Sequence, residues 1–306
     1  MICANFGAFP SWRFLFSMTL EKQSFGKVNL LLNILGRRPD GFHELETLMY
    51  PVNLCDTLTF SRTARGIDLT CNDPSLPVDS TNLVHRAAAA FLEKARISEG
   101  VAIHLEKKIP MAAGLGGGSG NAATTLLALN ELFDGPLKGK ELQQIAAELG
   151  SDVPFFLQSK PALATGRGEK IQPLDFFAAV RGTAFVLMRP GFGISTAWAY
   201  QQLVRFPAAL NGKPGRAEKL IRALQTTDLS TTARDFYNAL EAPAFYKFPL
   251  LQIIQDFLRE NGALATLMSG SGSTTFALAR DLAAAQAIQR KIREQFGPVW
   301  TAVSAM

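Results

Sequence analysis

One short glycine-rich segment constrains this chain more than any other feature. Five of the seven residues from Gly114 to Gly120 are glycine, and an alanine- and leucine-rich stretch, 121–133, follows at once. Glycine accepts positive φ angles and lets a ligand approach the main chain, and unpaired N–H groups at a helix N-terminus bind anions. We therefore expect a helix to start near Gly120–Ala122, with the backbone N–H groups of residues 114–120 around a phosphate. A flexible linker would not lead directly into an apolar helical stripe, here Ala122, Leu126, Leu129 and Leu132.

This loop matches neither of two common phosphate-binding patterns. No lysine follows the glycines, which excludes the G-x-x-x-x-G-K-[ST] loop of P-loop NTPases. In a dinucleotide fingerprint a strand leads directly into the glycines, but here Pro110 breaks the strand just before the loop. No acidic residue stands about 20 positions later in a suitable strand either, so this fingerprint is excluded. The glycines therefore indicate a phosphate without identifying the molecule that carries it.

Length and composition limit the class of protein. A chain of 306 residues fits two domains better than one core. Its 31 basic and 26 acidic residues are scattered, whereas a nucleic-acid-binding protein normally clusters its positive charge. No apolar run reaches the roughly 20 residues that span a bilayer. Because the cysteines form no C-x-x-C pair, we expect a reducing cytoplasm and neither a disulfide framework nor a cysteine zinc site; they are Cys3, Cys55 and Cys71.

The first 17 residues differ from the rest of the chain. They are rich in aromatic side chains, carry one charge at Arg13, and precede a second methionine, Met18, after which regular patterning begins. They lack the basic start and the small-residue cleavage site of a signal peptide. An upstream start codon or a non-essential tail is favoured over a targeting role, so we expect truncation to Met18 to leave the protein folded and active.

Apolar periodicity predicts a mixture of strands and helices. Their order lacks a regular βαβ alternation, which favours two α+β domains over one doubly wound sheet. The pattern restarts near residue 182, so we expect domains over 1–180 and 181–306. We expect strands at 26–36, 46–62, 66–72, 101–110 and 183–191, a hairpin or strand pair at 161–174, and a strand–glycine turn–strand unit at 263–280. We expect helices at 79–95 (capped by Asp79, Ser80 or Thr81), 121–133, 139–150 (ended by Gly150), 195–204, 215–225, 249–261 and 281–296.

Two charged residues lie in apolar surroundings. Asp152 stands between Gly150 and a Pro-Phe-Phe run, where it would be either a helix cap or a functional carboxylate. Lys27 begins a strand that is otherwise apolar, where an edge lysine that reaches solvent is the ordinary interpretation. If the two met beside the phosphate loop, they would form a phosphoryl-transfer site, in which the aspartate takes a hydroxyl proton and the lysine offsets charge. Their separation in sequence does not show whether they meet.

Four segments together resemble a known family. They are GKVNLLLNILGRRPDGFHELETLM (26–49), IPMAAGLGGGSGNAATTLLALN (109–130), LGSDVPFFL (149–157) with ATGRGE (164–169), and LMSGSGSTTFAL (267–278). In this order they are similar to the GHMP kinases. The resemblance implies a two-domain α+β fold with an ATP-binding N-terminal domain and a ferredoxin-like C-terminal domain. It also implies an active site between the domains, with ATP and Mg²⁺ as cofactors.

The segment 36–48 narrows the resemblance, because other GHMP kinases lack it. It resembles the branch of the family that phosphorylates the 2-hydroxyl of 4-diphosphocytidyl-2-C-methyl-D-erythritol in non-mevalonate isoprenoid biosynthesis. The resemblance implies that Lys27 and Asp152 are catalytic, and that Asn29, Phe42 and His43 contact the substrate together with Asp152. It assigns a metal contact to Ser119, and ATP binding to Lys107, Pro110, Gly114, Leu115, Gly116, Gly117, Gly118, Ser119, Gly120 and Asn121.

Three positions depart from the family pattern. Gly120 replaces the second serine of the usual Gly-Gly-Gly-Ser-Ser loop, which leaves Ser119 as the hydroxyl for a phosphate or Mg²⁺. Phe42 replaces the more frequent tyrosine and can still stack on a base. The usual Asn-Asp-Leu-Glu of the second domain appears as NALE, 238–241.

The residues leave several alternatives open. Without the resemblance, His43 would be an ordinary surface histidine and SGSGS, 269–273, a simple turn. Another GHMP kinase, of the homoserine or mevalonate type, would share the glycine loop, and so would an inactive nucleotide- or sugar-binding protein of this fold. The resemblance implies a small-molecule partner, no nucleic acid, no membrane, and a monomer or weak homodimer.

Overall fold

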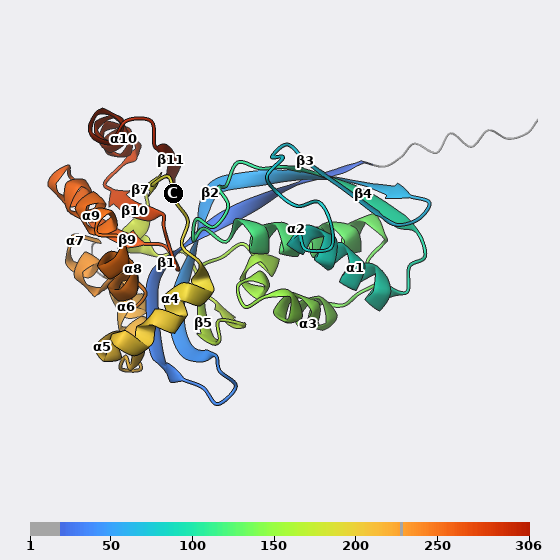
Figure 1. Cartoon of the computed structure of the whole chain (residues 1–306), viewed down its shortest axis with the longest axis horizontal. Coiled ribbons are helices and arrows are strands. Elements are labelled where there is room, and N and C mark those ends of the chain that lie inside the picture. The colour runs from blue at the N-terminus through green and yellow to red at the C-terminus, as the bar shows by residue number, and fades with distance from the viewer. Residues whose placement is uncertain (1–18, 227–228) are drawn as a thin grey trace, which may run out of the picture.

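The computed structural model describes residues 19–226 and 229–306, and in these residues it contains two β-sheets, the first of which is built around one long hairpin (Figure 1). The expected tail, 1–17, lies outside the described residues. The hairpin consists of β1, Leu20–Arg37, and β2, His43–Thr63, which pair antiparallel along most of their length. In Figure 1 it runs from the helices α1, α2 and α3 across to the second sheet. Both strands are longer than their apolar cores predicted.

The first sheet is built around this hairpin. In the described part of the chain it has seven strands, in the order β3-β4-β2-β1-β8, with β5 paired to β2 and β6 paired to β5. The short strand β8 pairs with β1 in parallel and comes from the second half of the sequence. The remaining strands are β3 (Ile67–Cys71), β4 (Gly100–Glu106), β5 (Ala162–Gly166), β6 (Lys170–Pro173) and β8 (Tyr237–Asn238).

Three helices cover one face of the first sheet: α1 (Leu83–Ala95), α2 (Gly117–Leu132) and α3 (Gly139–Leu149). The predicted cap of α1 was wrong by one residue, because the Asn82 side chain accepts the Val84 N–H. The carboxylate of Asp79 is occupied locally by the N–H and hydroxyl of Thr81. Gly150 ends α3, as predicted.

The second sheet is antiparallel, in the order β11-β7-β10-β9. Strand β10 lies between β7 and β9, and helices follow β7 and β10 along the chain, which is the split βαβ arrangement of a ferredoxin-like fold. The expected α+β class with a ferredoxin-like second half is therefore confirmed. The strand after the last helix was not predicted. The elements are β7 (Ala184–Arg189), β9 (Ala265–Met268), β10 (Thr275–Ala279), β11 (Trp300–Ala305), α9 (Leu250–Glu260) and α10 (Leu282–Phe296).

The side chains of β7 point alternately to the two faces of the second sheet, and one of these faces packs against the hairpin of the first sheet. Phe185 and Leu187 point to one side and pack with Val28, Leu30 and Leu48 of the hairpin. The residues between them point to the other side, where α9 and α10 cover the sheet. The remaining α-helices of the described residues are α4 (Thr196–Gln202), α5 (Pro207–Leu210), α6 (Arg216–Thr226), α7 (Leu229–Thr232) and α8 (Glu241–Lys247).

We propose that the boundary between the domains lies near residue 181, because the last turn before the second sheet is the 3₁₀ helix η2, Ala178–Val180. Among the described helices, none has the length and apolar character needed to cross a membrane.

Candidate active site

A cavity of about 1100 Å³ opens between the two sheets. Its lining comes from β1, from the glycine loop before α2, from the turn after α3, from α4, and from the turn between β9 and β10. Cavities of this size, with polar groups converging on an apolar wall, are typical ligand sites. Of the residues assigned by the resemblance, Gly120 is not among the lining residues.

The glycine loop forms the N-terminus of α2, but the helix begins earlier than predicted. Gly116, with a φ of 70°, is the cap, and the first helical residue is Gly117. The expected start near Gly120–Ala122 was therefore wrong. The N–H of Gly120 already donates to the Gly116 oxygen at 2.8 Å, so this group is not free for an anion. The first-turn N–H groups that lack an intrahelical partner are those of Gly117, Gly118 and Ser119.

Close contacts explain why this loop contains glycine. A Cβ on Gly114 would lie 2.0 Å from the backbone oxygen of Ser269, and one on Gly116 would lie 2.6 Å from the Phe156 ring. A Cβ on Gly120 would lie 2.9 Å from the backbone oxygen of Phe25. The last contact gives a physical reason why this chain has no second serine after Ser119.

Lys27 and Asp152 lie together beside this loop. The Lys27 ammonium is 3.5 Å from Asp152 Oδ2, and it donates to Asn29 Oδ1 at 2.6 Å and to the Gly114 oxygen at 3.2 Å. Only 2% of Lys27 is exposed, so it is not an edge lysine that reaches solvent. Asp152 precedes the 3₁₀ helix η1, Val153–Leu157, but among the described residues its side chain makes no capping hydrogen bond. The interpretation of Asp152 as a mere cap was therefore wrong.

Asn29 is held in place by a residue that the sequence analysis missed. Its amide nitrogen donates to Thr47 Oγ1 at 2.8 Å, and the Thr47 hydroxyl donates to the Leu31 oxygen at 2.6 Å. Both ends of the Asn29 side chain are thus occupied within the protein, while the residue still lines the cavity. This chain of hydrogen bonds fixes the Asn29 oxygen that receives Lys27.

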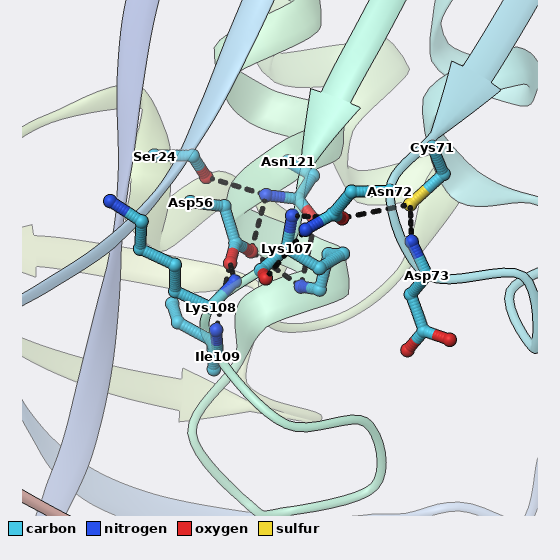
Figure 2. Close-up of polar contacts among 9 residues, drawn as sticks. All are labelled: Ser24, Asp56, Cys71, Asn72, Asp73, Lys107, Lys108, Ile109 and Asn121. Carbon is cyan, nitrogen blue, oxygen red and sulfur yellow. Dashed lines mark hydrogen bonds and ion pairs between the residues drawn. The ribbon is translucent and has the colours of Figure 1, made fainter.

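Lys107 forms a buried ion pair with Asp56, a second residue that the sequence analysis missed (Figure 2). Asp56 is fully buried, and its Oδ1 accepts the N–H groups of Lys108 and Ile109 at 2.7 and 2.8 Å. Its Oδ2 accepts the amide of Asn121 at 2.9 Å and contacts the Lys107 ammonium. A Cβ on Gly117 would lie 3.2 Å from that ammonium, so this cation sits directly under the start of α2.

Aromatic residues also line the cavity, among them Phe42, His43 and Tyr200. Half of Phe42 is exposed, and the guanidinium of Arg167 lies 4.7 Å from its ring centroid. The rings of His43 and Tyr200 are 5.1 Å apart and tilted by 38°. Burial, together with the charge of Arg37, lowers the pKa of His43, which favours a neutral imidazole at neutral pH. Arg167 and Tyr200 were not assigned from the sequence.

The SGSGS segment is more than an isolated turn. The Ser269 hydroxyl donates to the Gly114 oxygen at 2.8 Å, and the Thr274 N–H donates to the Ala113 oxygen at 3.3 Å. The turn between β9 and β10 of the second sheet therefore supports the glycine loop that precedes α2. In the part of the chain that the structure describes, no group of three or more His, Cys, Asp or Glu side chains is placed to hold a metal.

Comparison with known proteins gives two family matches. Residues 82–160 match the GHMP kinases N terminal domain, and residues 207–297 match the GHMP kinases C terminal domain. A 4-diphosphocytidyl-2-C-methyl-D-erythritol kinase of Synechococcus sp. (strain JA-3-3Ab) is 43% identical over 84% of this chain and 84% of its own length. The kinase of the same name from Pelotomaculum thermopropionicum is 41% identical over 90% of this chain and 94% of its own length.

Solved structures give the same picture of the fold. The crystal structure of a 4-(cytidine 5'-diphospho)-2C-methyl-D-erythritol kinase matches with a TM-score of 0.74 and 35% identity, over 94% of this chain and 100% of that one. A homoserine kinase from Cytophaga hutchinsonii matches with a TM-score of 0.75 and 20% identity, over 99% of this chain and 97% of that one. The latter likeness concerns the fold alone.

Proposed function

The chain belongs to the GHMP kinase family, and we propose that it transfers the γ-phosphate of ATP to the 2-hydroxyl of 4-diphosphocytidyl-2-C-methyl-D-erythritol, giving the 2-phosphate and ADP. This reaction belongs to non-mevalonate isoprenoid biosynthesis. The two relatives of 43% and 41% identity and the solved structure of 35% identity support the reaction. The observation that carries the chemistry is the meeting of Lys27 and Asp152, 3.5 Å apart, beside the N-terminus of α2.

The donor side would use the main chain of the glycine loop. Free N–H groups at Gly117, Gly118 and Ser119, aligned with the helix dipole, favour the negative phosphates of ATP. Lys107 adds a positive charge beneath them. Because Asp56 neutralises that lysine, its contribution depends on how the ion pair is oriented, and we propose that ATP draws the ammonium toward the phosphates.

Mg²⁺ would accompany ATP at this position. The ion usually keeps several waters and is held by substrate phosphates with one or two protein oxygens rather than by a protein cage. Ser119 fits this requirement, because it lies in the first turn of α2 and lines the cavity. The ion would neutralise charge on the phosphate oxygens.

Asp152 would act as the general base. The acceptor hydroxyl is tertiary and weakly acidic, so a carboxylate that takes its proton as the bond to phosphorus forms lowers the barrier. Lys27 would offset the negative charge that spreads over the reacting oxygens. Its ammonium is held by Asn29 and Gly114, so it needs little reorganisation during the reaction.

The aromatic residues of the lining would receive cytosine. Planar bases stack on aromatic side chains, and Phe42 and Tyr200 offer rings in this region. A neutral His43 imidazole carries one hydrogen-bond donor and one acceptor, which suits the edge of a base. The guanidinium of Arg167 lies over the Phe42 ring, and its positive charge would attract the diphosphate of the substrate.

An ADP-release assay with the cytidine substrate, homoserine and mevalonate side by side tests the proposal. We expect turnover of the cytidine substrate far above the others. Asp152→Asn keeps the size of the side chain but removes the base, so it should lower kcat by roughly 10²–10⁴ while ATP binding is retained. Preference for another acceptor would identify a different GHMP kinase, and an inactive wild type would identify a binding protein. Near-normal turnover of the Asp152→Asn variant would refute the role of Asp152.

A further inference from the structure

The NALE segment, 238–241, is the one family motif whose role the reaction above leaves unexplained. It begins with the last residue of β8, whose Tyr237 and Asn238 pair in parallel with Leu31 and Leu32 of β1. The Ala239 N–H also donates to the Leu32 oxygen at 2.9 Å. The segment is therefore attached to the strand that carries Lys27.

The side chain of Asn238 reaches from this strand to the second sheet. Its amide nitrogen donates to the Met268 oxygen at 2.7 Å and to the Gly270 oxygen at 2.8 Å. Its oxygen accepts the Leu240 N–H at 2.9 Å. Asn238 is 2% exposed, and both amide hydrogens and the oxygen are used. It thus holds the two carbonyls on either side of Ser269.

Glu241 holds the same place from its other side. Its Oε1 accepts the Met268 N–H at 2.8 Å and the amide of Gln255 at 2.5 Å. The N–H of Met268 is bound by Glu241 and its carbonyl by Asn238. The start of the 269–273 turn is therefore fixed by two side chains of one short segment.

This turn sets the position of the groups around Lys27. The Gly114 oxygen accepts both the Ser269 hydroxyl at 2.8 Å and the Lys27 ammonium at 3.2 Å. A Cβ on Gly270 would lie 3.3 Å from both Lys27 Nζ and Asn29 Oδ1. A shift of the turn would therefore move an acceptor of Lys27.

We propose that Asn238, supported by Glu241, is a positioning residue for phosphoryl transfer, which holds the 269–273 turn against Gly114 and thereby keeps the Lys27 ammonium beside Asp152. The inference rests on the proposed function for its catalytic consequence. A misplacement of about 1 Å at a reacting group can cost on the order of 100-fold in rate. Asn238 does not line the cavity, so it would act through the turn and touch neither substrate.

Asn238→Ser removes the amide that binds both carbonyls, and Asn33→Ser is the matched control. Asn33 is also fully buried on β1, and its amide donates to Glu46 and to the Lys213 oxygen, both at 2.9 Å. It does not line the cavity. Both variants should lower the melting temperature, but only Asn238→Ser should lower kcat, roughly 10- to 100-fold, with KM for ATP and acceptor within about threefold of wild type.

Two further measurements separate positioning from general damage. Ser269→Ala, a milder change in the same path, should lower kcat, and its effect should be less than multiplicative with Asn238→Ser, because both act through Gly114. Its effect should multiply with that of Asn33→Ser. Amide hydrogen exchange should accelerate at Ser269 and Thr274 in Asn238→Ser and stay unchanged there in Asn33→Ser.

Each outcome decides the inference. A kcat within twofold of wild type in Asn238→Ser, multiplicative effects with Ser269→Ala, or unchanged exchange at the turn would overturn it. Turnover by the wild type tests the proposed function separately. If the wild type prefers another acceptor, the same comparison is made with that acceptor, and the exchange rates give a result without any acceptor at all.

Discussion

Replacing Asp56 by asparagine would test the buried ion pair under the glycine loop. The carboxylate receives four donors: two backbone N–H groups on Oδ1, and Lys107 with Asn121 on Oδ2. An asparagine oxygen can serve one of these pairs. Its NH₂ group, which can only donate, would then face the other pair of donors inside the protein and leave them without an acceptor.

The expected loss follows from which groups stay unpaired. If the asparagine oxygen keeps the backbone N–H groups, the Lys107 ammonium, whose side chain is 7% exposed, loses its counter-charge. Breaking a buried ion pair by removing one partner costs about 3–5 kcal/mol, because the remaining charge is uncompensated. At about 2–4 °C per kcal/mol, the melting temperature should fall by roughly 6–20 °C.

Urea unfolding measures the loss of stability, and ATP titration measures the effect on ATP binding. In urea, the free energy of unfolding of Asp56→Asn should be lower than that of wild type by about 3–5 kcal/mol. Adding Lys107→Met should recover much of this loss, since an apolar replacement of a buried pair is often nearly neutral. The double variant should still bind ATP more weakly than wild type. Asp134→Asn, at an exposed pair with Arg62, should change stability by less than about 1 kcal/mol. A loss in Asp56→Asn as small as that of this control, or a double variant no more stable than the single one, would refute the reasoning.

Three further variants test other parts of the site. Phe42→Ala should raise KM for the cytidine substrate about tenfold, as expected for a lost stacking contact of roughly 1–3 kcal/mol, and leave KM for ATP unchanged; equal rises would place Phe42 in a structural role. Burial raises the pKa of Glu241 to about 7, above its unfolded value of 4.5, so its contribution to stability falls as pH rises between these values. Relative to Glu241→Gln, wild type should therefore lose about 2 kcal/mol between pH 5 and 8, a difference absent in the exposed control Glu218→Gln. Gly120→Ser should lower the melting temperature, because its Cβ would press on the Phe25 oxygen; an unchanged value would show that the backbone adapts.

Local signals were sufficient for much of the fold. Apolar spacing located the long helices and most strands of both sheets, with β8 and β11 as the exceptions, because each located element buries one face along a continuous stretch of sequence. The start of α2 was misjudged since glycine is a poor helix former. Phe156 and Ile109 pack so closely against the first turn that a Cβ on Gly116 or Gly117 would lie within 3.0 Å of them, which is a tertiary constraint that local propensity does not record.

The groups that complete the site could not be predicted in the same way. Asp56 pairs with Lys107 across 51 positions, and Asn238 holds carbonyls about 30 positions away. Such partners are brought together by the sheets, and no local spacing records them. The strand around Asp56 contains several other polar residues, so the sequence offered no local signal that this carboxylate is buried and needs a partner.

The geometry of Lys27 suggests why a buried lysine suits this reaction. A lysine ammonium has three N–H donors, and two are engaged by Asn29 and Gly114. The third faces Asp152 at 3.5 Å, beyond the usual length of an N–H···O hydrogen bond. An acceptor hydroxyl that enters between Lys27 and Asp152 would replace the longest of the three Lys27 contacts. It would therefore displace neither Asn29 nor Gly114. The ammonium would then already point at the oxygen on which charge develops, and the Asp152 carboxylate would be free to take the proton.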